Sequence, residues 1–585
     1  MITIILSIVV FPTILVVFRC RKNANKAENV RLALTFAIAC YSFSSALSYV
    51  LDYDRQSLII TVLVFLLLFL LDSKFSQKTA LYKWSPKIIF LIIIFFASVL
   101  IKMTLVWGCR TFPLYDVRNV YIALQLPLDG FAALFVIDWL KNILTKSILC
   151  LLAFTPLWFT YFAKQKHSYS IIVTICFGIF AWGLISFSMD VPLKEYYRVF
   201  TNTEEEKKFL ETSAFWDSNF VDIDTDSISS FDKRNLILIF MESMENTFSD
   251  SSSGGIQTSN LIPYLTNLAN NNISFSNTSL LGGGRNIYGS TNTLKSSICK
   301  ITGLPVINEA IRRTVVFPNV VSLYDFLKKN GYTNWFIQGT DAKFAGMEDF
   351  LNNHSIDSLL DLRVLKEKSD MSSKWRNFRT FSAGLTDKRV FDISKHLLDS
   401  LSKKEPFSLS IVTIETHFPY GLYDDNCAIK PIDDSEESLF RASLQCADLN
   451  VKEFIEDLKR KSFFENTTIV IVGDHLFMGS YLVGTEKINR RWINIFLNSA
   501  IDPYHKTNRE FSSVDMAPSI IESLGFRLSK HRMGFGVSLF SEEKTLLERY
   551  NYDTLYEEFF RLRNAKQYYE KLFNEKNATK NSIFP

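Results

Sequence analysis

Two apolar runs end in side chains that are able to bind a metal ion. Residues 469–472 form a β-branched run that is followed, after one glycine, by Asp474 and His475. A second apolar run, residues 235–241, is followed at once by Glu242. Such runs are typical of buried strands, and open α/β sheets place their chemistry at the carboxyl ends of their strands. Either run alone reads equally well as an ordinary strand that ends in an acid. Together, in a chain with only seven histidines, they favour a site for one divalent cation.

The composition divides the chain into two parts. Of the 585 residues 48% are hydrophobic, and the excess lies before about residue 190. The net charge of +4 is too small to indicate binding to nucleic acid, and the eight cysteines show no zinc-ribbon spacing. Apolar runs of spanning length recur in the first part, at about residues 2–18, 30–51, 57–72, 87–106, 146–163 and 170–189. We therefore predict a polytopic α-helical membrane domain at residues 1–190 with about six spans.

The charges of the connecting loops predict the orientation of this membrane domain. Basic residues gather in alternate loops, around residues 19–31 and 74–87 and at Lys164 and Lys166. The positive-inside rule places these loops in the cytoplasm, so everything after residue 190 is expected outside. The segment 108–141 then lies on the outer side, and we expect an amphipathic element at the interface, with a solvated loop as the alternative.

The rest of the chain predicts an α/β domain. Residues 191–232 are charged and read as a linking helical arm, and residues 546–585 as a charged helical tail. Between them, from 233 to 545, strand-like and helix-like runs alternate, which is typical of a mixed sheet covered by helices. Residues 332–337 and 407–414 are predicted strands, and residues 263–270 and 449–458 predicted helices.

A glycine run raises the question of a phosphate-binding loop. Residues 282–284 are all glycine and Arg285 follows them. No Gly-Lys-Ser/Thr comes after this run, so a P-loop is excluded. We interpret the run as a plain loop.

Several blocks of this domain resemble one family. The chain resembles the membrane-anchored phosphoglycerol transferases, which include the lipoteichoic acid synthases and the transferases that decorate periplasmic glucans, within the alkaline phosphatase/sulfatase superfamily. The order of the blocks favours the glucan-decorating branch. Beyond the two strand ends, the resemblance rests on residues 260–277, 289–293 with 303–305, 338–346, 384–387, 416–419, 473–478 and 515–519.

The resemblance assigns roles to particular residues. It implies that Glu242, Thr293, Asp474 and His475 bind the metal ion and that Thr293 is the nucleophile. The chain reads Gly-Ser-Thr-Asn-Thr at 289–293, where family members often read Gly-Thr-Gly-Trp-Thr, so Thr291 is the alternative nucleophile. The spacing to the Gly-Leu-Pro at 303–305 favours Thr293.

The resemblance also implies residues that contact the substrate. His417 is expected to hydrogen-bond the phosphate or to protonate a leaving oxygen. Asp341, Lys343 and Asp387 are candidates for contacts with head-group hydroxyls or phosphate. Each of these three residues alone reads equally well as a solvated surface charge.

The implied activity is metal-dependent transfer of phosphoglycerol from phosphatidylglycerol to an envelope glycan or polymer. It would proceed through a phospho-threonine and release diacylglycerol. The ligand set favours Mn²⁺, with Mg²⁺ or Zn²⁺ as alternatives. The implied location is a bacterial inner membrane, with the sulfatase-like domain in the periplasm or outside.

Other functions are open. A phosphoethanolamine transferase would have the same architecture, water could intercept the phospho-threonine in a hydrolase, and a non-catalytic membrane scaffold is a fourth possibility. A sulfatase proper is excluded, because the chain lacks the Cys/Ser-x-Pro-x-Arg segment from which the modified nucleophile of sulfatases is made.

The cysteines of the soluble part suggest one disulfide. Cys427 and Cys446 lie near each other in sequence, on the side of the membrane that we predict to be oxidising. Cys299 lies close to the predicted nucleophile segment and is not an obvious partner. We therefore predict a Cys427–Cys446 bridge.

Overall fold

The computed structural model describes residues 140, 143, 212–223, 233–307, 317–343, 346–367, 384–418, 420–479, 481–483 and 490–572. The six predicted spans, nearly all of the segment 108–141 and most of the linking arm lie outside these residues. Within the described part, no helix combines the length and the apolar character that crossing a bilayer requires.

A six-stranded sheet forms the centre of the domain, in the order β3-β2-β4-β1-β5-β6. Five neighbouring strands run parallel and β6 pairs antiparallel to β5, which confirms the predicted mixed sheet. Every residue of β1, β4 and β5 is buried. Accordingly β1 and β5 are mostly apolar, whereas β4 also buries Ser408 and Ser410. The bounds are β1 Asn235–Met241, β2 Thr333–Gln338, β3 Ser358–Leu360, β4 Phe407–Val412, β5 Thr467–Gly473 and β6 Asn494–Leu497.

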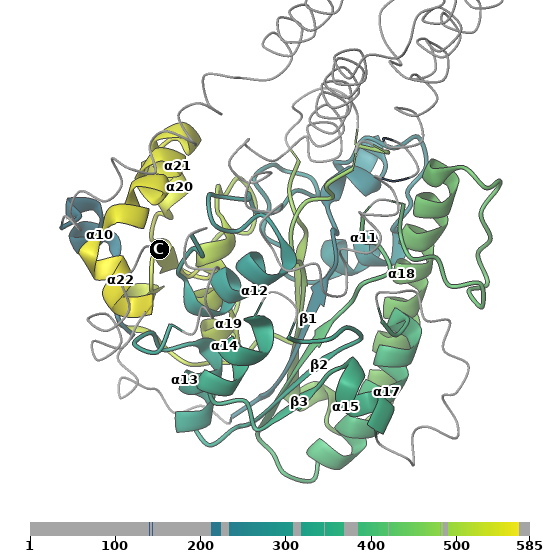
Figure 1. Ribbon diagram of the computed structural model, residues 1–585, viewed down its shortest axis with the longest axis horizontal. Helices are drawn as coiled ribbons and strands as arrows, with labels where there is room; N and C mark the ends of the chain where they lie inside the picture. The colour runs from purple at the N-terminus through teal and green to yellow at the C-terminus, as the bar shows by residue number, and fades with distance from the viewer. Residues whose placement is uncertain are drawn as a thin grey trace, which may run out of the picture. The chain divides into compact units, whose positions relative to one another are not determined.

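Helices cover both faces of this sheet (Figure 1). On one side lie α12 (Thr293–Thr302), α13 (Leu323–Lys329), α14 (Met347–Asn353) and α19 (Met516–Ser523). On the other side α17 (Asp387–Leu401) packs against α18 (Glu436–Leu458), and α18 packs against α11 (Pro263–Asn271). Shorter elements include α15 (Leu362–Glu367) and the hairpin of β7 (Arg532–Met533) and β8 (Gly536–Val537).

The predicted helix at 449–458 is confirmed but begins much earlier. The side chain of Ser435 accepts a hydrogen bond from Ser438 N, and Glu436 and Glu437 lie in the first turn of α18. This is an ordinary helix start, because a serine cap and acidic residues satisfy the first amides and the positive end of the helix dipole.

The charged tail packs against the core of the domain. It contains α20 (Leu546–Arg549), α21 (Tyr552–Arg561) and α22 (Lys566–Leu572), and its buried residues Leu555 and Phe559 belong to the main hydrophobic cluster. The short helix α10 (Ala214–Asn219), from the predicted arm, lies beside these helices (Figure 1), and the ring of Trp216 is 6.4 Å from that of Tyr568.

Cys427 and Cys446 form a disulfide with an S–S distance of 2.00 Å, which confirms the predicted bridge. Cys299 is free and buried. The bridge joins the loop around Cys427 to the middle of α18, across a sequence separation of 19 residues.

Removing this bridge is expected to destabilise the domain. For a loop of this length, the double variant Cys427→Ser/Cys446→Ser should unfold with a free energy lower by about 3 kcal/mol, because the unfolded chain regains conformational entropy. Denaturation in urea measures the difference, and reduced wild-type protein should behave like the variant. Identical unfolding curves for oxidised wild type and the variant would contradict the expectation.

Candidate active site

The register of the sheet brings the two strand ends together. Strands β1 and β5 are parallel neighbours in which Met241 pairs with Gly473, so Glu242 and Asp474 leave the sheet side by side. The Asp474 amide donates to Met241 O at 2.9 Å. The ligand atoms of Glu242, Asp474 and His475 all lie within 4.8 Å of one another, and all three side chains are buried.

Thr293 completes this group. It is the first residue of α12, whose start is capped by the Asn292 side chain. The Thr293 hydroxyl donates to Glu242 Oε2 at 3.1 Å and lies 3.3 Å from His475 Nε2. The structure thus brings together the four residues predicted to bind the metal ion, with the hydroxyl of Thr293 against Glu242 and His475.

The hydrogen bonds of the site leave two ligand atoms available to bind a cation. His475 Nδ1 donates to Leu476 O at 2.8 Å, so in the neutral imidazole Nε2 carries a lone pair. Asp474 Oδ1 accepts from the amides of Ser243 and His475, at 2.7 and 2.6 Å. Asp474 Oδ2 is buried, and it has no hydrogen-bond partner among the described residues. A buried carboxylate oxygen without a partner is costly, so the residues present fit a divalent cation.

The pKa values of the site also fit a divalent cation. Burial raises the pKa of Asp474 to about 6, and the charge of Glu242 adds to this effect. Burial would lower the pKa of His475, but the carboxylates of Asp474 and Glu242 outweigh it and raise that pKa. A divalent cation reverses both tendencies, because it favours the ionised carboxylate and the unprotonated imidazole.

The segment after β4 holds the backbone of Glu242. Glu242 N donates to Thr413 Oγ1 at 2.9 Å, and Thr416 Oγ1 donates to Glu242 O. The hydroxyl of Ser243 donates to Glu242 Oε1 at 2.6 Å. Sequence reasoning missed these three residues, since hydroxyl side chains carry no local signal of which backbone they will meet.

A buried lysine joins α12 to the end of β5. Positions 293, 296 and 300 of α12 lie on one helix face. Ser296 Oγ and Lys300 Nζ both donate to Asp474 O, the latter at 2.7 Å. Burial lowers the pKa of Lys300 to about 7. Sequence reasoning missed Lys300 as well, although a lysine in phase with Thr293 on an otherwise buried helix was a usable signal.

His417 lies close enough to the site to respond to its charges. It is buried, and its Nδ1 donates to Phe418 O at 2.6 Å. Burial lowers the pKa of His417 to about 3, with smaller effects from His475, which lowers it, and Asp474, which raises it. The imidazole is therefore neutral in the free protein.

The other predicted substrate residues differ in their surroundings. Asp341 and Lys343 follow β2, whose carboxyl end lies on the same edge of the sheet as Glu242. Lys343 is exposed, and Asp341, at 42% exposure, pairs with Arg363 at 2.9 Å. Asp387 is only 1% exposed, and backbone amides engage both of its carboxylate oxygens. This position differs from the head-group contact that the sequence predicted, because a buried carboxylate with both oxygens engaged is not available to a ligand.

The glycine run packs against a tryptophan. A Cβ on Gly283 would lie 1.9 Å from Trp492 O, and one on Gly284 would lie 2.0 Å from the Trp492 ring. The glycines are thus needed for close backbone packing, in agreement with the interpretation as a plain loop.

Known proteins resemble this chain in sequence. The sulfatase family profile matches residues 234–526, which is half of the chain. The chain belongs to the sulfatase family. Its curated relatives include phosphoglycerol transferase I of Salmonella choleraesuis (strain SC-B67) and of Salmonella typhi. Each is 32% identical over 255 residues, covering 42% of this chain and 32% of the relative. The chain thus matches about a third of the length of these relatives.

Solved structures similar to this chain include the lipoteichoic acid synthase LtaP from Listeria monocytogenes. LtaP is 16% identical with a TM-score of 0.43, and the alignment covers 55% of this chain and 79% of LtaP. The phosphoglycerol transferase GacH of Streptococcus pyogenes, in complex with sn-glycerol-1-phosphate, has 15% identity, a TM-score of 0.38, and coverage of 60% and 92%. The periplasmic domain of EcEptC from Escherichia coli, in a complex with Zn, has 17% identity, a TM-score of 0.39, and coverage of 57% and 96%.

Proposed function

We propose that this protein transfers phosphoglycerol from phosphatidylglycerol to an envelope glycan or polymer. The observation that carries the proposal is the Thr293 hydroxyl, held between Glu242 and His475 at the start of α12. The name of the curated relatives, phosphoglycerol transferase I, supports the choice of the transferred group.

Glu242, Thr293, Asp474 and His475 would hold one divalent cation. The carboxylate, hydroxyl and imidazole donors suit Mn²⁺, with Mg²⁺ or Zn²⁺ as alternatives. When bound, such an ion lowers the pKa of the threonine hydroxyl and polarises a phosphoryl oxygen.

The protein's own groups then account for the two transfers. In the first, a bond forms between Thr293 Oγ1 and phosphorus while the bond from phosphorus to the diacylglycerol oxygen breaks. The proton lost by Thr293 is needed on that leaving oxygen. We assign His417, which is neutral in the free protein, to carry this proton. Once protonated, its imidazolium also donates a hydrogen bond to an oxygen of the phosphodiester. In the second transfer an acceptor hydroxyl attacks phosphorus and the bond from phosphorus to Thr293 Oγ1 breaks. His417 takes the proton of the acceptor and passes it to Thr293 Oγ1, which regenerates the hydroxyl.

Asp341 and Lys343 are the residues that we assign to the glycerol hydroxyls and the phosphate. A site that hydrogen-bonds substrate hydroxyls discriminates strongly against analogues that lack them, so phosphatidylethanolamine should be a poor donor. We place the domain outside the cytoplasm, attached to the bacterial inner membrane by the predicted spans. The Cys427–Cys446 disulfide supports an oxidising compartment.

Release of diacylglycerol tests this function. Purified full-length protein, with Mn²⁺, should release diacylglycerol from liposomes of labelled phosphatidylglycerol and much less from labelled phosphatidylethanolamine. Lipid extraction and chromatography measure the product. Release from phosphatidylethanolamine alone would assign the protein to phosphoethanolamine transfer, and no release from either lipid would overturn the transferase proposal.

A further inference from the structure

Asp387 and Glu415 hold each other's backbone. The amide of Glu415 donates to Asp387 Oδ2 at 3.2 Å, and the amide of Asp387 donates to Glu415 Oε1 at 3.1 Å. The amide of Ile414 donates to Asp387 Oδ1 at 2.7 Å. Both acids are 1% exposed. We call this reciprocal pair, Asp387 with Glu415, the clasp.

The clasp acts on the segment that carries His417. Residues 413–416 follow β4 directly, and on one side Thr413 and Thr416 bind the backbone of Glu242. On the other side the clasp fixes the same segment to the start of α17. The amide of His417 donates to Ile414 O at 3.0 Å, so the position of the imidazole depends on residues that the clasp holds.

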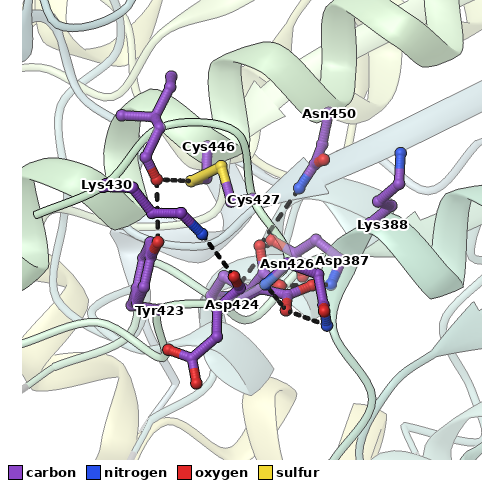
Figure 2. Close-up of a disulfide and its surroundings, with 12 residues drawn as sticks. Asp387, Lys388, Tyr423, Asp424, Asn426, Cys427, Lys430, Cys446 and Asn450 are labelled. Atoms are coloured by element: carbon purple, nitrogen blue, oxygen red, sulfur yellow. Dashed lines mark hydrogen bonds between the residues drawn. A yellow bond between two sulfur atoms is a disulfide. The ribbon is translucent and has the colours of Figure 1, made fainter. Parts of the chain in front are cut away.

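Helix α18 supports the clasp from a third side. Asn450 Nδ2 donates to Glu415 Oε2 at 3.3 Å. One turn earlier on the same helix, Cys446 forms the disulfide to Cys427, whose amide donates to Asp424 O. Figure 2 shows Asp387, Asn450, Asp424 and the disulfide gathered in one cluster.

The arrangement is costly for the fold, which argues that it does more than fill space. Burial raises the pKa of Asp387 to about 7 and raises that of Glu415 well above its ordinary value. Two buried acids side by side cost the fold stability, so packing alone does not account for the pair.

We propose that Asp387 is a positioning residue that, through the clasp, holds His417 at the phosphate of the substrate. The inference rests on the proposed role of His417. In this role the Asp387 carboxylate does not contact the substrate. Replacing Asp387 should therefore weaken substrate binding only by displacing His417.

The test compares Asp387→Asn with a matched control. Asparagine keeps one acceptor but turns an amide group toward the Glu415 N–H, so the clasp opens. Asp448 is the control, because it is also buried and its two oxygens accept from the amides of Tyr264 and Leu265, at 2.9 and 2.8 Å. Asp448→Asn therefore makes the same chemical change at the start of α11. Binding of sn-glycerol 1-phosphate, the head group of phosphatidylglycerol, to the metal-loaded full chain is measured by calorimetry, and hydrogen exchange of the Ile414 and Glu415 amides by mass spectrometry.

Loss of one hydrogen bond to a charged group corresponds to a Kd weaker by about tenfold or more, and we expect this in Asp387→Asn and in His417→Ala. Because the two residues act as one unit, the double variant should bind like His417→Ala alone. Exchange at Ile414 and Glu415 should rise in Asp387→Asn only. Asp448→Asn should bind like wild type. If Asp387→Asn folds poorly, Asn450→Ala loosens the clasp more gently, and it should weaken binding less, again without adding to His417→Ala.

Three results would overturn the inference. Wild-type affinity in both Asp387→Asn and Asn450→Ala, with a weakened His417→Ala, would remove the role of the clasp and leave the proposed function standing. Losses that add in full in the double variant would give Asp387 a role independent of His417. Wild-type affinity in His417→Ala would instead overturn the assignment of His417, and the inference with it.

Discussion

Thr293→Ala is expected to abolish phosphoglycerol transfer while the protein stays folded. The variant removes the only atom that we assign to form the covalent bond to phosphorus, so the rate should fall by about 10³-fold or more. Stability should change little, because Thr293 is only partly buried and loses one hydrogen bond, to Glu242 Oε2, a change of about 1 kcal/mol. Diacylglycerol release measures the rate, and thermal unfolding checks the fold.

Thr291→Ala is the matched control for this expectation. It makes the same change two residues away in the same segment and should retain transfer. Retained transfer in Thr293→Ala together with loss in Thr291→Ala would move the nucleophile to Thr291.

The second large effect is expected from Asp474→Asn. The substitution keeps the acceptor for the amides of Ser243 and His475, but it places an amide group where Oδ2 is buried without a partner. A bound cation would then face N–H donors in place of an anionic oxygen. We expect bound metal to fall from one ion per chain to none, and transfer to fall by about 10³-fold or more. The metal-free fold should not weaken, because a buried carboxylate next to Glu242 is removed.

Metal analysis of the purified variants checks this expectation. Asp448→Asn, which alters a buried carboxylate away from the centre, should keep its metal. Chelation of wild-type protein should likewise stop transfer, and re-addition of Mn²⁺, Mg²⁺ or Zn²⁺ separately would identify the ion that supports it. A full complement of metal in Asp474→Asn would contradict the proposed ligand set.

The sequence predicted the centre of the site because the relevant residues end strands. Glu242 and Asp474 each follow a continuous apolar run, and the parallel register of β1 and β5 turns two separate positions into neighbours. Thr293 lies on a different element, at the start of α12. The pattern of strand ends could not identify Thr293, and its prediction came from the resemblance to a known family.

The residues that support the centre could not be predicted in the same way. Asp387 begins a helix after Gly-Leu-Thr, a place where an acid is common at a helix start, yet its partner amides lie 27 and 28 residues further along the chain. Lys300 and Thr416 donate to the backbone carbonyls of Asp474 and Glu242, which follow β5 and β1. Such contacts depend on tertiary packing, so a local pattern can mark a side chain such as Lys300 as unusual but cannot identify the carbonyl that it meets.

We propose that Thr293 carries phosphoglycerol during the reaction. The intact mass of the enzyme tests this covalent intermediate most directly. Metal-loaded full-length protein is incubated with phosphatidylglycerol in the absence of acceptor, quenched in acid and weighed by mass spectrometry, with fragmentation to locate the added group. We expect a mass increment of one phosphoglyceryl group on Thr293, absent from Thr293→Ala and absent when phosphatidylethanolamine replaces the donor. An unmodified enzyme that nevertheless releases diacylglycerol, or an increment of phosphoethanolamine, would contradict it.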